Sequence, residues 1–146
     1  MSSVNKVILI GNLGENPSIR NLQGSDRVAG FSVATSERWA DKRTGEKKEK
    51  TEWHRVSIFN QGLVGLCEKY LTKGTKVYLE GQLQTRKWTD KAGLERYSTE
   101  VVLKPYGGTL RILFSPKDQQ HGGHTDQSAG ANGGQASHQA PLDDEI

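Results

Sequence analysis

Cysteine is almost absent from the sequence, since Cys67 is the only one among 146 residues. A single thiol cannot form an internal disulfide, which fits a reducing compartment. Its apolar neighbours predict a buried thiol on a helix rather than a reactive one. Long apolar runs are absent too, because no segment approaches the about 18 residues of a membrane span. The first residues match neither a signal peptide nor a transit peptide, so we expect a cytoplasmic protein without a membrane partner.

Basic and aromatic residues are missing from the end of the chain. No Lys, Arg, Phe, Tyr or Trp occurs from Asp118 to Ile146, a stretch with five acidic residues. Residues 1–117 hold all twenty basic and twelve acidic side chains, a net charge of +8, and the remainder carries −5. Basic domains attract polyanions such as nucleic acid. We predict a basic domain over residues 1–114 and a disordered, Gly/Gln/Ser-rich tail with an acidic end over 115–146.

Groups suited to catalysis are scarce in the first 114 residues. His54 is the only histidine there, and its predicted position on an apolar strand face favours a core or interface role. His121 and His124 lack a Cys or carboxylate partner at the spacing of a structural metal site. Neither residues 11–14 nor Gly107-Gly108 match a phosphate-binding loop. We therefore predict no catalytic residue, no metal and no cofactor, and a protein that is not an enzyme.

The sequence predicts a mostly β protein, because β-branched and aromatic residues cluster between Gly, Asn and Pro. Apolar residues at helical spacing from Leu63 to Leu71 predict one helix, which Lys73-Gly74 ends. The charged stretch from Asp41 to Lys50 predicts a loop or hairpin tip. Strands are expected at residues 4–13, 28–36, 51–60, 76–88 and 94–104, with a last short segment at 109–114.

This order of elements predicts an all-β OB-fold. An OB-fold is a five-stranded barrel, and the predicted helix would lie between its strands 3 and 4. A β-sandwich is the structural alternative, although it would not need that helix.

Successive side chains point to opposite faces of a strand, so alternate positions sort into two faces. On the third strand His54 and Val56 belong to the apolar face. On the fourth strand Val77, Leu79 and Leu83 form the expected core face. The opposite faces carry large aromatics beside arginines: Trp53, Arg55, Ser57 and Phe59 on the third strand, and Tyr78, Gln82, Gln84, Arg86 and Trp88 on the fourth.

Aromatic rings on a polar face can also pack under a loop or form a subunit contact. Two strands with the same arrangement, together with Trp39 ahead of the basic loop, favour nucleic acid instead. Aromatic rings stack on unpaired bases while nearby cations hold phosphates. Duplex DNA presents no free base faces, so the combination predicts binding of single strands.

The sequence resembles the bacterial single-stranded DNA-binding proteins over about residues 4–114, and again at the acidic end. The resemblance is carried by specific motifs rather than by composition. They are Val4-Asn5-Lys6-Val7-Ile8-Leu9-Ile10-Gly11-Asn12-Leu13-Gly14, Ala34-Thr35-Ser36-Glu37-Arg38-Trp39, Thr51-Glu52-Trp53-His54-Arg55-Val56, Gly81-Gln82-Leu83-Gln84-Thr85-Arg86-Lys87-Trp88-Thr89-Asp90 and Thr99-Glu100-Val101-Val102.

The resemblance implies sequence-independent binding of single-stranded DNA during replication, recombination and repair. It places stacking aromatics at Trp39, Trp53, Phe59 and Trp88. It also implies a homotetramer with His54 at a subunit interface. The phosphate-contacting cations that it implies are Lys6, Arg20, Arg55, Lys73, Arg86, Lys87 and Arg96.

The acidic end resembles the segment that docks replication and repair proteins in this family. Family tails usually end in an acidic run followed by Ile-Pro-Phe. Here the matching residues are Asp143, Asp144, Glu145 and Ile146, and no Pro-Phe follows. The sequence thus implies a partner-docking tail that lacks the usual aromatic anchor.

Two other classes of protein remain open at this point. One is a different OB-fold binder, such as a primosomal accessory protein or an RNA-binding, cold-shock-like module, although no feature indicates contacts to a 2′-hydroxyl. The other is a nuclease or ligase with an OB-fold, which would need a carboxylate cluster or a nucleotide-binding lysine motif. The sequence shows neither.

Overall fold

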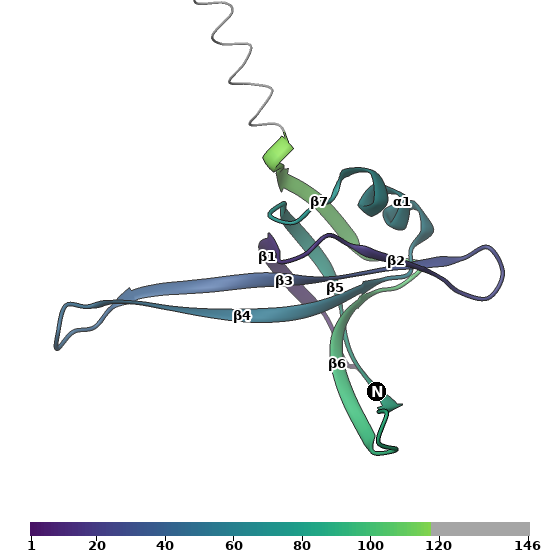
Figure 1. Ribbon diagram of the computed structural model, residues 1–146, viewed down its shortest axis with the longest axis horizontal. Coiled ribbons are helices and arrows are strands. Elements are labelled where there is room, and N and C mark those ends of the chain that lie inside the picture. Colours follow the sequence, from purple (N-terminus) through teal and green to yellow (C-terminus); the bar gives the residue numbers. More distant parts are fainter. Residues whose placement is uncertain (118–146) are drawn as a thin grey trace, which may run out of the picture. The chain divides into compact units, whose positions relative to one another are not determined.

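The computed structural model describes residues 1–117, and its strands and helix all lie within the unit Met1–Phe114. Seven strands and one helix follow one another along residues 1–114 (Figure 1). They are β1 (Val7–Leu13), β2 (Ser18–Asn21), β3 (Arg27–Ala40), β4 (Lys47–Ile58), α1 (Gln61–Tyr70), β5 (Lys76–Thr89), β6 (Glu95–Leu103) and β7 (Thr109–Phe114).

Five of the strands close into a barrel in the order β1-β3-β4-β6-β5, and β5 pairs back to β1. The pair β4–β6 is parallel, and the other pairs are antiparallel. With α1 between β4 and β5, this confirms the predicted five-stranded OB-fold barrel. Two short strands lie outside this ring: β7, anticipated as a short segment, pairs with β5, and β2, which was not predicted, pairs with β3.

Strand β1 closes the barrel because it pairs with two strands. Residues Val7–Asn12 pair with β5, and Asn12 and Leu13 pair with β3. A Cβ on Gly11 would lie 2.2 Å from the carbonyl oxygen of Ala34. Only glycine allows the two backbones to approach this closely, so Gly11 makes the closure possible. The predicted start of this strand at Val4 was wrong by three residues, since β1 begins at Val7.

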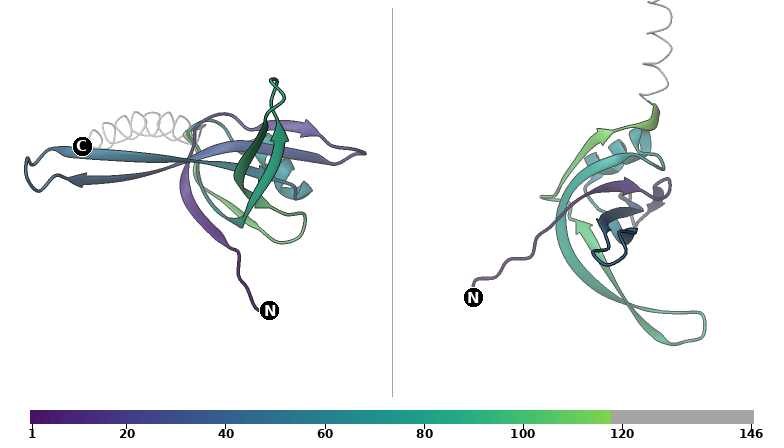
Figure 2. Two further views of the ribbon diagram at one scale, coloured as in Figure 1. Left: turned by 90° about the horizontal axis from the view of Figure 1, so that it is seen from below. Right: turned by 90° about the vertical axis from the view of Figure 1, so that its left-hand side faces the viewer.

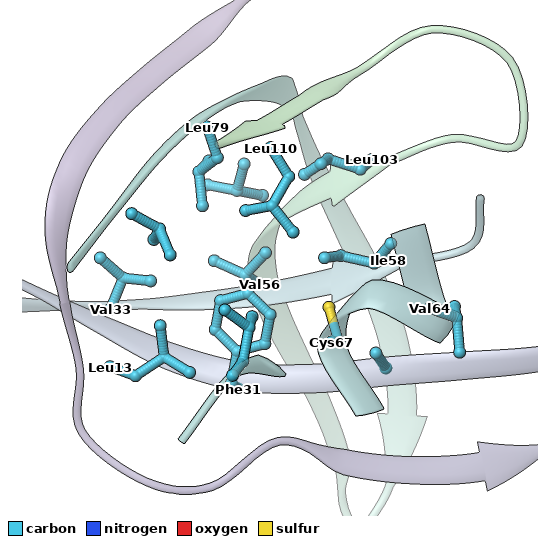
Figure 3. Close-up of a cluster of buried hydrophobic side chains, with 14 residues drawn as sticks. Leu13, Phe31, Val33, Val56, Ile58, Val64, Cys67, Leu79, Leu103 and Leu110 are labelled. Atoms are coloured by element: carbon cyan, nitrogen blue, oxygen red, sulfur yellow. The ribbon is translucent and has the colours of Figure 1, made fainter. Parts of the chain in front are cut away.

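The core fills the barrel with side chains from alternate strand positions. Phe31, Ile58, Leu79 and Leu103 are its largest fully buried members, and Figure 3 shows them converging from β3, β4, β5 and β6. The prediction that Leu83 belongs to the core was wrong, because its side chain is 51% exposed. Every residue of β5 after Gly81 is exposed, since the strand there leaves the barrel for its hairpin with β6.

Helix α1 packs against β3 and β4. Its first turn is capped by the Asn60 side chain, which accepts a hydrogen bond from the Leu63 N–H at 3.2 Å. Val64 and Cys67 are its buried residues, which confirms the buried helical thiol. Burial raises the pKa of Cys67 to about 12. In the described part of the chain, no helix is long and apolar enough to cross a membrane.

Two hairpins extend beyond the barrel, one formed by β3 and β4 and the other by β5 and β6 (Figures 1 and 2). The first is longer than predicted, because β3 runs to Ala40 and β4 begins at Lys47. Only residues 41–46 of the expected loop, Asp41 to Lys50, form the tip. Opposite charges across the two strands, such as Arg38 and Glu49, whose Nε and Oε1 atoms lie 3.6 Å apart, stabilise strand residues that look like a loop by composition.

Candidate nucleic-acid interface

The predicted polar faces of β4 and β5 lie on the outside of the barrel. Residues directly opposite each other in a sheet project to the same face. Arg86 lies opposite Ser98 and Trp88 opposite Arg96, while Ser57 of β4 lies opposite Val102 of β6. We call this surface of β4, β6 and β5 the outer face; its larger polar and aromatic side chains are Trp53, Arg55, Phe59, Gln84, Arg86, Trp88, Arg96 and Glu100.

Two indoles of the outer face are exposed, with 62% of Trp53 and 44% of Trp88 accessible. Trp53 is oriented by the chain that leaves β1, because a Cβ on Gly14 would lie 2.3 Å from its Cζ3 atom. The ring therefore lies directly against a backbone that has no side chain. The indole is in contact with this backbone on one side while much of the ring meets solvent, which suits a ring that stacks on a flat partner.

A recess of about 280 Å³ lies on the same outer face. Phe59 is half-buried in its wall. Arg20 reaches it from β2, Arg86 from β5 and Glu100 from β6. The remaining lining residues are Asn21, Leu22, Val28, Ser57, Gln84 and Val102. Three predicted site residues thus meet here: one ring and two cations.

Trp39 is not part of this group. On β3 it has the same parity as the inward-facing Phe31 and Val33, whereas Trp53 lies opposite Ala34, which has the other parity. Trp39 is 46% exposed and lines a separate recess of about 450 Å³ on the β3–β4 hairpin. That recess is otherwise lined by Arg38, Ala40, Lys47, Lys48 and Glu49. Three of the four predicted aromatics therefore lie on the outer face, and Trp39 has the opposite parity on the β3–β4 hairpin.

Five of the seven predicted phosphate-contacting cations form ion pairs with carboxylates. The nitrogen–oxygen distances are 2.6 Å for Lys6–Glu80, 3.0 Å for Arg55–Glu15, 3.0 Å for Lys87–Glu95 and 2.9 Å for Arg96–Asp90, and the fifth pair is Arg86–Glu100. Arg20 and the Lys73 side chain form no ion pair within residues 1–117, although the Lys73 backbone N–H donates to Asn16 Oδ1 at 2.8 Å. Exposed pairs are weak and screened by salt, so a phosphate can share or replace the carboxylate.

These pairs shift the pKa values of the carboxyl groups. Hydrogen bonds from Lys6 and Tyr78 lower the pKa of Glu80, and the Arg96 hydrogen bond lowers that of Asp90. Burial alone would raise the pKa of Glu100, but hydrogen bonds from Ser57 and Arg86 and the positive charges of Arg86 and Arg55 lower it overall. All three carboxylates are therefore ionised near neutral pH.

His54 lies on β4, away from the outer face. It is half-buried, and its Nε2 atom lies 2.8 Å from the Thr35 hydroxyl oxygen of β3. It shares the parity of the buried Val56 and Ile58, as predicted. Among the described residues, no group of three or more His, Cys, Asp or Glu side chains could hold a metal ion. The predicted docking residues Asp143, Asp144, Glu145 and Ile146 lie outside the described residues.

The model of the single-strand binding protein family matches residues 4–110, which include every element except the last residues of β7. The chain belongs to this family. A single-stranded DNA-binding protein of Rickettsia conorii is 46% identical over 99% of this chain and 97% of its own length. That of Rickettsia prowazekii is 47% identical over the same shares.

Solved structures also resemble this member of the family. A Plasmodium falciparum SSB complex with ssDNA superposes with a TM-score of 0.71 at 45% sequence identity. The match covers 78% of this chain and 98% of that chain. Fold and sequence therefore agree over the barrel that carries the outer face.

Sequence reasoning missed two residues that hold predicted ones in place, namely Gly14 against Trp53 and Glu100 against Arg86. The position of Glu100 could have been deduced. A tight turn joins the strands predicted at 76–88 and 94–104, with the Asp90 N–H donating to the Leu94 carbonyl at 3.0 Å. Counting back from this turn places Glu100 opposite Gln84. Gly14 and Glu15 reach β4 from a loop about 40 residues earlier in the chain, and no local pattern indicates such a contact.

Proposed function

We propose that this chain is a sequence-independent single-stranded DNA-binding protein, which protects and organises unpaired strands during replication, recombination and repair. The observation that carries the proposal is the outer face, where exposed rings alternate with cations on neighbouring strands. Bases stack on rings, and cations hold the phosphates between them. The relatives named single-stranded DNA-binding proteins support this assignment, as does the likeness to a complex with ssDNA.

The stacking residues we assign are Trp53, Phe59 and Trp88 on the outer face and Trp39 on the hairpin. A DNA strand that lies on the outer face can contact Trp53, Phe59 and Trp88 without leaving that face. Trp39 requires a longer strand that continues to the β3–β4 hairpin. The assigned phosphate contacts are Lys6, Arg20, Arg55, Lys73, Arg86, Lys87 and Arg96.

We assign DNA binding to residues 1–114, since every strand that the described residues form lies within Val7–Phe114. Contacts with replication and repair proteins are assigned to residues 115–146, through the acidic residues Asp143, Asp144 and Glu145 and the adjoining Ile146. This division, and a cytoplasmic location, rest on the sequence. The proposed activity is binding without a catalytic step.

A homotetramer completes the proposal. Strand β1 pairs with β3 only at Asn12 and Leu13. Its preceding residues pair with β5 on one edge, and their other edge is open to another strand. Ile8 and Ile10 of β1 are 55% and 50% exposed. An open strand edge beside exposed apolar side chains favours association, and a second copy of the chain would cover both.

Equilibrium competition tests the function. Labelled oligo(dT) bound to the protein is displaced with unlabelled single strand or with duplex of equal length. We expect the single strand to compete far better, with little dependence on its sequence and a steep dependence on salt. Incubation with Mg²⁺ should leave the labelled strand at its original length. Equal competition by duplex contradicts the binding proposal, and shortening of the strand contradicts the absence of catalysis.

A further inference from the structure

Glu100 is the one buried charged residue within residues 1–117, and it lies on the outer face. Its side chain is 6% exposed. Oε1 accepts a hydrogen bond from Arg86 Nε, and Oε2 accepts one from the Ser57 hydroxyl. The carboxylate is therefore held from β5 and from β4 at once.

A buried negative charge is unexpected on a surface that binds a polyanion. It repels phosphates, and removing it from water is costly unless its partners compensate. The other carboxylates that pair with cations of the site are more exposed, from 19% for Asp90 to 61% for Glu95. Glu100 must therefore contribute something that its charge alone does not.

That contribution is visible in the hydrogen bonds of Arg86. Only the Nε of its guanidinium is bound, and its two terminal amino groups have no partner within residues 1–117. The guanidinium is planar, so fixing the Nε edge fixes the direction of the remaining donors. The Arg86 side chain is 59% exposed and lines the recess next to Phe59. Without Glu100, a long exposed side chain would lose rotamer entropy on binding.

We propose that Glu100 is a positioning residue for DNA binding, which holds the Arg86 guanidinium so that its two terminal amino groups meet a phosphate of the strand beside Phe59. The inference rests on the proposed function and deepens it. Bidentate contact between a guanidinium and a phosphate is strongly dependent on direction, and Glu100 supplies that direction in advance.

Glu15 provides a matched control. It pairs with Arg55 at 3.0 Å on the same face, but its side chain is 52% exposed and it accepts a second hydrogen bond from the Ser32 hydroxyl, at 3.3 Å. Glu15→Gln and Glu100→Gln remove the same charge from the same surface. Electrostatics alone predicts tighter DNA binding for both variants, whereas positioning predicts weaker binding for Glu100→Gln only.

The test measures binding of fluorescein-labelled oligo(dT) by anisotropy at several salt concentrations. The proteins are the wild type, Glu100→Gln, Glu15→Gln, Arg86→Ala and the double variant Arg86→Ala/Glu100→Gln, with thermal melts to check folding. We expect Glu100→Gln to bind about tenfold more weakly, the effect of one charge-assisted hydrogen bond. Its salt slope should approach that of Arg86→Ala. The double variant should bind no more weakly than Arg86→Ala, and Glu15→Gln no more weakly than the wild type.

Equal or tighter binding by Glu100→Gln overturns the inference, and so does a loss that adds fully to that of Arg86→Ala. Neither result touches the proposed function, which fails only if the wild type itself does not prefer single strands. If Glu100→Gln does not fold, Ser57→Ala replaces it, because that change removes one support of the carboxylate and leaves its charge. A smaller loss in the same direction is then expected, and unchanged affinity overturns the inference.

Discussion

Trp53 leaves 62% of a large apolar ring in contact with water. Side chains of this kind lower the free energy of a complex when a flat partner covers them. Arg86 is exposed to a similar extent but contributes charge rather than area. The two residues lie on neighbouring parts of one face, so their substitutions separate stacking from phosphate binding.

We expect Trp53→Ala to weaken binding of single-stranded DNA by about 1–3 kcal/mol while the salt slope stays nearly unchanged. Arg86→Ala should instead reduce the slope by about 0.7–1 unit, because one phosphate fewer is neutralised. Both are measured by titration over a range of salt, with melts to confirm that the variants fold. Indistinguishable salt profiles for the two variants would show that this division of roles is wrong.

Gly14 tests how the orientation of Trp53 is set. A methyl group there would lie 2.3 Å from the indole, so Gly14→Ala must displace the ring. We expect a loss of DNA affinity approaching that of Trp53→Ala, together with a shift of tryptophan emission in the free protein.

Gly65→Ala is the control for that substitution. A Cβ on Gly65 of α1 would meet no atom within 4 Å. This variant should be more stable by up to about 1 kcal/mol, the helix propensity gain of alanine, with unchanged DNA binding. If Gly14→Ala binds DNA like the wild type, the ring does not depend on this support.

Among the strands and the helix, the sequence predicts the barrel because strand alternation and helical spacing are local signals. Strand β2 was missed because it has only four residues, directly after a proline. The ends of β3 and β4 were missed because alternating Lys and Glu resemble a loop until their cross-strand partners are known. Leu83 was misplaced because alternation does not show where a strand leaves the barrel.

The candidate site also has a part that the sequence predicts and a part that it does not. Alternation alone placed Trp53, Phe59 and Trp88 outward; Trp53 and Trp88 are exposed, and the half-buried Phe59 lines the recess of the outer face. Trp39 came from family resemblance, and the structure separates it from the others. Contacts between distant segments, such as Gly14 with Trp53, depend on the barrel register and have no local signal.

The length of the β3–β4 hairpin leads to a prediction for Trp39. One OB-fold binds about 4–16 nucleotides of single-stranded DNA. A DNA strand of about 8 nucleotides can therefore occupy the outer face alone. We expect Trp39→Ala to leave its affinity unchanged and to weaken binding of poly(dT), whereas Trp53→Ala should weaken both. Equal loss for Trp39→Ala on short and long strands would place this ring with the other three.

For the assembled protein, the exposed Ile8 and Ile10 and the open edge of β1 support the proposed homotetramer. We expect light scattering to give about four times the 16.1 kDa of the chain. Ile10→Lys places a charge on the exposed apolar surface of β1. His54→Lys places a charge beside Thr35, at the half-buried position that we assign to the subunit interface. Burying either charge without a partner is costly, so both should lower the mass.

Lys69→Glu, an exposed change on α1, is the control for assembly and should keep the mass of the wild type. A stable monomer of the wild type at micromolar concentration would contradict the tetramer. Unchanged mass for Ile10→Lys would exclude the outer surface of β1 as a subunit contact.

Stacking of the exposed indoles on unpaired bases changes their environment, so tryptophan fluorescence reports this contact without a label. Trp39, Trp53 and Trp88 are the only tryptophans of the chain, so all emission comes from proposed stacking residues. Titration with poly(dT) should quench the emission to a saturating level, and added salt should restore it as the strand dissociates. Duplex DNA under the same conditions should produce little quenching. Saturated binding of poly(dT) without quenching, or equal quenching by duplex, would contradict the account.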